Sequence, residues 1–173
     1  MGYDLYGNRP VENKEIGSYF RANVWWWRPI WNFCETECDD ILTDRDMEKG
    51  HFNDGRTISK TKSIKIAKRI YKLIDKGYIK ELDDNYKKAK EVSDAKNKII
   101  DTKLDELSKK ANKGIPKLNK ESFLVPRDYP KELYNEYEEL TLTKCWVGSY
   151  PFDGKFLKEF ADFCLNSGGF DIC

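Results

Sequence analysis

The sequence predicts an α+β fold: a single, mainly helical domain with a small sheet that joins the termini and a long charged helical arm. Three observations lead to this prediction. Apolar residues recur at three- and four-residue steps over much of the chain. Short strand-like segments lie at both ends. A central stretch is rich in Lys, Glu and Asp and keeps only a thin apolar stripe. We therefore assign the core to residues 1–83 and 112–173 and the arm to about 84–111.

Length and composition limit the class of protein. At 173 residues the chain is long enough for one domain with a true core. Its 31 Lys and Arg against 30 Asp and Glu give a net charge of +1, so net charge does not indicate nucleic acid or an anionic membrane as a partner. No apolar run approaches the roughly 18 residues that span a bilayer, so we expect no membrane partner. Five cysteines without a Cys-x-x-Cys pair, and no charged-then-apolar leader, predict a cytoplasmic protein with reduced thiols.

The two ends of the chain are predicted to pair as strands. Tyr3 and Leu5 alternate with other residues between two glycines, which is typical of a short strand that ends in a turn. Residues 170–172 form a second short strand-like segment. We expect this terminal strand to pair with residues 3–6 and to tie the two ends into one small sheet.

Residues 19–42 form the aromatic centre of the sequence. Four of the five tryptophans lie within seven positions, at Trp25, Trp26, Trp27 and Trp31. Three consecutive rings do not share one face of a helix or a strand. Some must therefore face the core, while at least one faces a second layer, a partner or a pocket.

A helix is predicted to follow the aromatic run. Pro29 suits the first turn of a helix, because its missing N–H costs nothing there. We therefore expect an extended Trp segment, a helix that starts at Arg28 and Pro29, and an end at about Leu42. Its apolar stripe consists of Ile30, Phe33, Cys34, Cys38, Ile41 and Leu42.

The middle of the chain contains a turn region and two helices. Residues 43–55 are polar and end in the turn signal Asn53-Asp54-Gly55. Ser59 is the expected N-cap of a helix that Gly77 ends. The arm helix follows, and its seam is predicted to consist of Tyr86, Ala89, Val92, Ala95, Ile99, Leu104, Leu107 and Ala111.

The last third of the sequence predicts a loop, two helices and a strand. The loop is marked by Gly114, Pro116, Pro126 and Pro130. A short helix is expected at 130–139, and residues 141–147 have strand character. Asp153 is the expected cap of a final helix that the two glycines at 168–169 end.

Five sequence blocks resemble those of a family of small proteins from bacteriophages and bacterial genomes whose function is uncharacterised. The blocks are MGYDLYG at the start, YFRANVWWWRP, HFNDG at 51–55, YPF at 150–152 and the closing SGGFDIC. They cover the two ends, about half of the chain. Relatives have two Cys-x-x-Cys-x-Gly-x-Gly zinc modules before YPF, whereas this chain has only Cys145 there. The resemblance implies a phage-type accessory protein and supplies no catalytic residue.

The candidate catalytic chemistry centres on His51, the only histidine. It lies in the HFNDG loop beside Asp54, a carboxylate suited to orient an imidazole. The alternative is a turn in which Asn53 and Asp54 bond to local backbone. We expect no catalytic constellation, since no nucleophile elbow or glycine-rich phosphate loop is present.

A metal site is a further alternative for His51 and the cysteines. Cys34 and Cys38 are one helical turn apart, and His51 with Cys164 or Cys173 would complete four ligands. Structural zinc more often uses tighter pairs on turns, and cysteine is among the most buried residue types. We therefore predict core thiols, no metal and no cofactor.

The aromatic segment also suggests a ligand cleft. Trp25, Trp26, Arg21 and Arg28, with Tyr3, Tyr6, Tyr19 and Trp27, would stack a base and bind its phosphate. The alternative is an aromatic core in which Arg28 meets acceptors near the helix start. The candidate binding residues are thus Trp25, Trp26, Arg28, Arg21, His51, Asn53 and Asp54.

Together these features predict a non-enzymatic phage-type protein that binds and antagonises a host protein, such as a nuclease-based defence of the CRISPR kind. The arm is the expected contact surface, with Lys87, Lys88 and Lys90 as partner-binding residues, and it also offers a route to homo-oligomers. Acidic residues around Tyr134 and Tyr137 would mimic phosphate. A nucleotide-binding protein is the alternative, and a His51- or metal-dependent hydrolase is the second alternative.

Overall fold

A computed structural model describes residues 2–12, 15–113 and 123–173. The chain forms two compact units, unit 1 (Met1–Lys87 with Ser149–Cys173) and unit 2 (Lys88–Gly148). This division differs from the predicted boundary, which placed residues 112–148 with the core. The described part of that segment belongs to the same unit as the arm, to which it is joined by bonds from Ser93 and Asn97 to Cys145 and by the Lys144–Asp101 ion pair.

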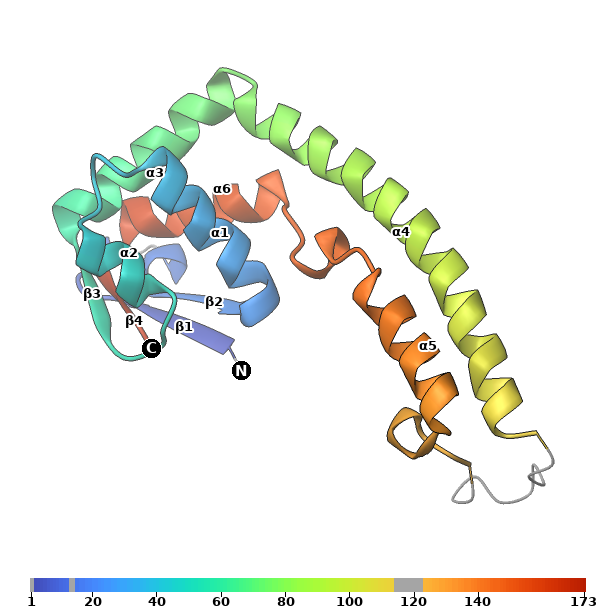
Figure 1. The fold of residues 1–173 in the computed structure, drawn as a ribbon. Helices are drawn as coiled ribbons and strands as arrows, with labels where there is room; N and C mark the ends of the chain where they lie inside the picture. Colours follow the sequence, from blue (N-terminus) through green and yellow to red (C-terminus); the bar gives the residue numbers. More distant parts are fainter. Residues whose placement is uncertain (1, 13–14, 114–122) are drawn as a thin grey trace. The chain divides into compact units, whose positions relative to one another are not determined.

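Unit 1 contains the predicted sheet, and the two termini pair within it (Figure 1). The strands are β1 (Gly2–Gly7), β2 (Tyr19–Asn23), β3 (Arg56–Ser59) and β4 (Gly169–Ile172), in the antiparallel order β2-β1-β4-β3. Leu5 lies opposite Ile172, so the predicted pairing of the ends is confirmed. The edge strands β2 and β3 were not predicted from the sequence.

One face of the sheet is the floor of the hydrophobic core. Its buried side chains are Tyr3, Leu5, Phe20, Ala22, Ile58, Phe170 and Ile172. The other face is more polar and includes the exposed Tyr6, Tyr19 and Arg21. This two-sided pattern follows from the alternation of side chains along each strand.

In the described part of unit 1, four helices lie wholly within the unit: α1 (Val24–Glu37), α2 (Asp44–Gly50), α3 (Lys60–Asp75) and α6 (Gly154–Asn166). The first part of α4 (Tyr78–Ala111) belongs to it as well. The predicted caps are present, since the side chain of Ser59 accepts from Lys62 N and that of Asp153 accepts from two N–H groups of α6. Gly77 and Gly168 follow α3 and α6 with φ of +76° and +67°, a backbone conformation that favours glycine. A short 3-10 turn covers Glu15–Gly17.

The tryptophan segment is helical, which corrects the prediction of an extended run. Helix α1 begins at Val24 because the Asn23 side chain accepts hydrogen bonds from the backbone N–H groups of Trp25 and Trp26. Pro29 therefore lies inside the helix and does not start it. The helix ends at Glu37, although Cys38 and Leu42 beyond it are buried as the stripe predicted.

The tryptophans of α1 face different surroundings, because three consecutive residues of a helix point in different directions. Trp27 and Trp31, four residues apart, are fully buried and stack with ring centroids 5.4 Å apart. Tyr3 stacks on the other side of Trp27, also at 5.4 Å. Trp26 is half-buried, and Trp25 is half exposed.

The two buried indoles hold α2, a helix within the region predicted to be polar turns. Trp27 Nε1 donates to the carbonyl of Gly50 at 2.7 Å, and Trp31 Nε1 donates to that of Met47 at 2.9 Å. These are carbonyls of the last turn, which lack partners inside the helix. A Cβ at Gly50 would overlap the Trp31 ring, so this position requires glycine.

A buried carboxylate fixes the other end of α2. Asp46 accepts from Thr43 N in a capping box and from Arg56 Nε, at 2.9 and 2.8 Å, and it also pairs with Lys62. Burial by itself would raise the pKa of Asp46. The bonds from Lys62, Thr43 and Arg56 outweigh that effect and lower the pKa well below its ordinary value of 3.8.

Unit 2 is a helical hairpin. It contains the second part of α4 (Tyr78–Ala111), a 3-10 turn at Pro126–Asp128, and α5 (Lys131–Leu142). Helix α5 confirms the helix expected at 130–139. The strand expected at 141–147 is wrong, since α5 continues to Leu142 and a 3-10 turn follows at Val147–Ser149. Gly114 and Pro116 lie outside the described residues.

The buried positions of α4 in unit 2 follow a heptad spacing that agrees with the predicted seam at Leu107 and departs from it at Val92 and Ile99. Ser93, Ile100 and Leu107 are buried at seven-residue steps, whereas Val92 and Ile99 are exposed. Hydrogen bonds between two residues of α4, Ser93 and Asn97, and Cys145 beyond α5 hold this face of α4 inward. Ser93 Oγ and Asn97 Nδ2 donate to the carbonyl of Cys145 at 3.1 and 2.7 Å, and Cys145 N donates to Asn97 Oδ1 at 2.9 Å.

Truncation of either buried indole should destabilise unit 1. We expect Trp27→Ala and Trp31→Ala to lower the free energy of unfolding by about 3–5 kcal/mol, measured in urea, because each empties a large buried site. Trp25→Ala in the same helix is the matched control and should cost less than about 1 kcal/mol, since that ring is half exposed. Urea curves of the two core variants that overlay the parent curve would contradict the core assignment.

The lowered pKa of Asp46 predicts a pH dependence. A carboxylate with a lowered folded pKa adds stability above its unfolded value of 3.8, and that stability is lost as the pH falls further. Asp46→Asn should therefore cost about 3 kcal/mol at pH 7, and its stability should fall less steeply than the parent's in acid. The control is Asp44→Asn, an exposed position in the same turn. Parallel stability–pH curves for the parent and Asp46→Asn would contradict the assignment.

Candidate binding pocket

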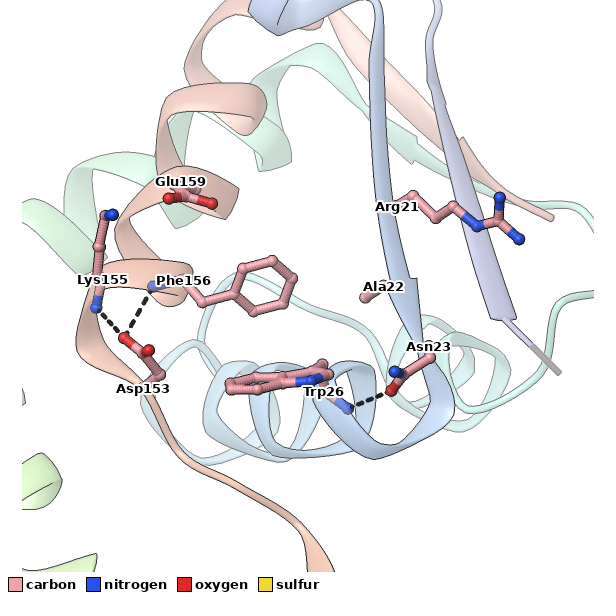
Figure 2. A pocket seen from close by; sticks show the side chains of 8 residues that line it. All are labelled: Arg21, Ala22, Asn23, Trp26, Asp153, Lys155, Phe156 and Glu159. Atoms are coloured by element: carbon pink, nitrogen blue, oxygen red, sulfur yellow. Dashed lines mark hydrogen bonds between the residues drawn. The ribbon is translucent and has the colours of Figure 1, made fainter. Parts of the chain in front are cut away.

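A cavity of about 510 Å³ lies in unit 1 between β2, α1 and α6 (Figure 2). Its lining residues are Arg21, Ala22, Asn23, Trp26, Asp153, Lys155, Phe156 and Glu159. Its volume is within the range of sites for small ligands, roughly 300–1,000 Å³. Two of the predicted binding residues, Arg21 and Trp26, thus belong to one site.

The walls of the pocket come from elements far apart in the sequence. Trp26 projects from the first turns of α1 and Phe156 from the first turn of α6, and their rings meet edge-on with centroids 5.3 Å apart. Phe156 also contacts Phe20 of β2, at 5.2 Å. The aromatic corner is therefore anchored in the core through Phe20, and Figure 2 shows the Trp26 and Phe156 side chains next to each other.

Two helix N-termini border the pocket, and both are already capped. Asn23 Oδ1 accepts from the N–H groups of Trp25 and Trp26 at 3.0 and 3.1 Å. Asp153 Oδ1 accepts from those of Lys155 and Phe156 at 2.7 and 3.2 Å. These two cap side chains are engaged with the helices, so recognition of a charged ligand falls to Arg21, Lys155 and Glu159.

Trp25 and Arg28 form a separate exposed cluster with Tyr150. The Trp25 and Tyr150 ring centroids are 5.2 Å apart. Arg28 Nη1 donates to the Tyr150 hydroxyl at 2.7 Å, and its guanidinium lies 5.6 Å from that ring's centroid. Neither Trp25 nor Arg28 lines the pocket beside Trp26, because both lie on a different side of α1 from Trp26.

His51, Asn53 and Asp54 are not part of the pocket either. His51 Nε2 lies 2.9 Å from Glu35 Oε1, so Glu35 orients this imidazole. Asp54, the partner considered from the sequence, pairs with Lys49 at 2.7 Å. Asn53 Nδ2 donates to the Gly2 carbonyl at 3.3 Å. Each of these three side chains makes a contact that supports the local fold.

The three lysines predicted to bind a partner lie on α4. Lys87 pairs with Asp83 at 2.7 Å, and this bond raises the pKa of the Lys87 ammonium. Lys90 pairs with Asp94, and Lys88 is exposed. Acidic neighbours one turn away thus offset two of the three charges.

The cysteines considered as metal ligands are mostly in the core. Cys34, Cys38 and Cys164 are fully buried, Cys145 is half-buried and Cys173 is exposed. A bond with Cys38 and complete burial raise the pKa of Cys34, and burial raises that of Cys164. Within the described ranges, no group of three or more His, Cys, Asp or Glu residues is placed to hold a metal ion.

Sequence reasoning missed the half of the pocket contributed by α6. Lys155, Phe156 and Glu159 lie about 130 positions after Trp26, and nothing local marks them as ligand-facing. Phe156 is half-buried at the rim of the core. Comparison of the chain with protein-family models, curated proteins and solved structures gave no match. Across the described residues, no helix is long and apolar enough to cross a membrane.

The cysteine environments predict two classes of thiol. In the native protein a thiol reagent should label Cys145 and Cys173 readily, because Cys34, Cys38 and Cys164 are buried. After denaturation without reductant all five should react. Fewer than five would reveal an oxidised pair, and rapid native labelling of all five would contradict the burial.

Proposed function

We propose that this protein is a non-enzymatic, phage-type accessory protein that binds a host protein in the bacterial cytoplasm. Its target would be a nuclease-based defence complex of the CRISPR kind, which it antagonises. The observation that carries this proposal is a set of large apolar side chains exposed on unit 2, here called the apolar surface: Val92, Ile99, Leu142 and Trp146. These side chains are 72%, 62%, 79% and 62% exposed.

The position of these residues supports a contact surface. Cys145 is bonded to Ser93 and Asn97, which places the adjacent Trp146 at the same end of the hairpin as Val92. Large apolar groups exposed together are typical of interaction sites. Tryptophan in particular is enriched among the residues that dominate binding energy.

The charge of α5 suits a target that normally binds nucleic acid. Glu132, Glu136 and Glu139 recur at helical spacing, and all three are exposed. A row of carboxylates presents negative charge much as a phosphate backbone does, and a basic nuclease channel would attract it. The lysines at 87, 88 and 90 contribute less, because two of them are paired with acidic neighbours.

The apolar surface would equally serve a second copy of the chain, the oligomer expected through the arm. The other two hypotheses rest on unit 1. The pocket beside Trp26 favours a small-ligand protein and is considered below. The hydrolase hypothesis has the His51–Glu35 bond as its main support, and the same bond suits a purely structural role.

The antagonist role predicts protection of a targeted plasmid. Bacteria with an active nuclease-based CRISPR defence should retain the plasmid when they express this chain, and the chain should co-elute with the purified defence complex. Trp146→Ala or Leu142→Ala should weaken the complex about 30-fold or more, the effect expected at a hot spot.

The matched control is Trp25→Ala, an exposed tryptophan of unit 1. It should leave protection intact, and circular-dichroism melts should show that all variants remain folded. Loss of the targeted plasmid at the empty-vector rate would contradict the antagonist role. A concentration-dependent dimer that Trp146→Ala abolishes, without binding to the defence complex, would assign the surface to self-association instead.

A further inference from the structure

We propose that the pocket between β2, α1 and α6 binds a nucleoside monophosphate. The base would stack in the corner of Trp26 and Phe156, the phosphate would be held by Arg21 and Lys155, and Glu159 would accept from a base or ribose donor. This proposal concerns unit 1 and is independent of the protein-binding role of unit 2.

The aromatic corner is suited to a flat ring. Trp26 and Phe156 already contact each other edge-on, so a ligand packs onto their open faces and does not insert between them. Figure 2 shows both rings facing the same space, with Ala22 of β2 on the far side. Stacking on aromatic side chains tolerates every base, because each base has a π-face.

The charged side chains around the corner offer partners for both an anion and a hydrogen-bond donor. Asp153 and Asn23 are engaged in capping α6 and α1. Of the other charged groups, Lys155 and Glu159 form no ion pair with the described residues, and Arg21 makes one long contact, 3.5 Å from its Nε to Asp4 Oδ1. Asp153 keeps its negative charge while it caps α6, so the lining balances two cations with two carboxylates, and Lys155 is the cation at hand for an anionic group of the ligand.

The two cations lie on opposite rims of the pocket, one on β2 and one on α6. Arg21 extends over β1, as Figure 2 shows, and its side chain is 68% exposed. Arg21 lies on the polar face of the sheet beside Asp4, so it must give up that contact and turn around the edge of β2 to meet a phosphate, whereas Lys155 has only to change its rotamer. Binding should therefore weaken with added salt.

Glu159 gives the site a directional acceptor. It lies three residues after Phe156 and thus on the same side of α6, above the aromatic corner. An exocyclic amine or a ribose hydroxyl is the matching donor. The combination of ring, anion and donor distinguishes a nucleotide from a free phosphate or a plain aromatic acid.

Titration with AMP, GMP, CMP and UMP, followed by calorimetry and by quenching of tryptophan fluorescence, tests the proposal on the intact chain. At least one nucleotide should bind with a Kd below about 1 mM. Adenosine and inorganic phosphate should each bind more weakly than AMP. Lys155→Gln should weaken nucleotide binding about tenfold by removing a charged contact, and Glu159→Gln should change the preference among bases.

Lys158→Gln is the matched control, since Lys158 lies one turn from Lys155, pairs with Asp162 at 2.9 Å and does not line the pocket. The Lys158→Gln variant should bind the nucleotide as tightly as the parent does. Thermal melts should show that all three variants are folded. The proposal is overturned if no nucleotide binds, if adenosine binds as tightly as AMP, if free tryptophan binds more tightly than any nucleotide, or if Lys158→Gln weakens binding as much as Lys155→Gln. Lack of nucleotide binding would leave the plasmid-protection result unaffected.

Discussion

Unit 1 depends on the way two buried tryptophans satisfy their indole N–H groups. Trp27 and Trp31 stack in the core, where an unpaired donor is costly. The only described carbonyls they bond are those of Gly50 and Met47, at the end of α2. The same two bonds therefore satisfy the rings and the last turn of a seven-residue helix that would be unstable alone. The core and α2 therefore stabilise each other.

The charged residues around α2 extend this arrangement to the sheet. Asp46 bonds to Arg56 at the start of β3 and to Lys62 in α3, so one carboxylate joins three elements. Because Asp46 is buried, each of its partners is needed to offset the cost of removing the charge from water. Edge strand β3 is attached to the fold by this network as well as by its pairing with β4.

The two surfaces with proposed functions differ in the kind of residue that forms them. The pocket of unit 1 combines aromatic walls with long charged side chains, a composition typical of small-ligand sites. The surface of unit 2 consists of large apolar groups on helices stabilised by a narrow seam. Such a hairpin gains little stability from exposing Trp146 and Leu142, and a binding role would account for that exposure.

Local patterns in the sequence determined much of the fold: the strands at the two ends, the caps Ser59 and Asp153, the glycines after α3 and α6, and the long charged helix. Each depends on neighbours within a few residues. The tertiary structure decided the rest. Pro29 suggested a helix start, but Asn23 capped the helix earlier. The strand-like pattern at 141–147 became the end of α5 and a turn segment in which Cys145 bonds to α4. The pocket was unpredictable in the same way, since Trp26 and Phe156 meet only when α1 and α6 pack on the sheet, and no local signal encodes a contact over 130 residues.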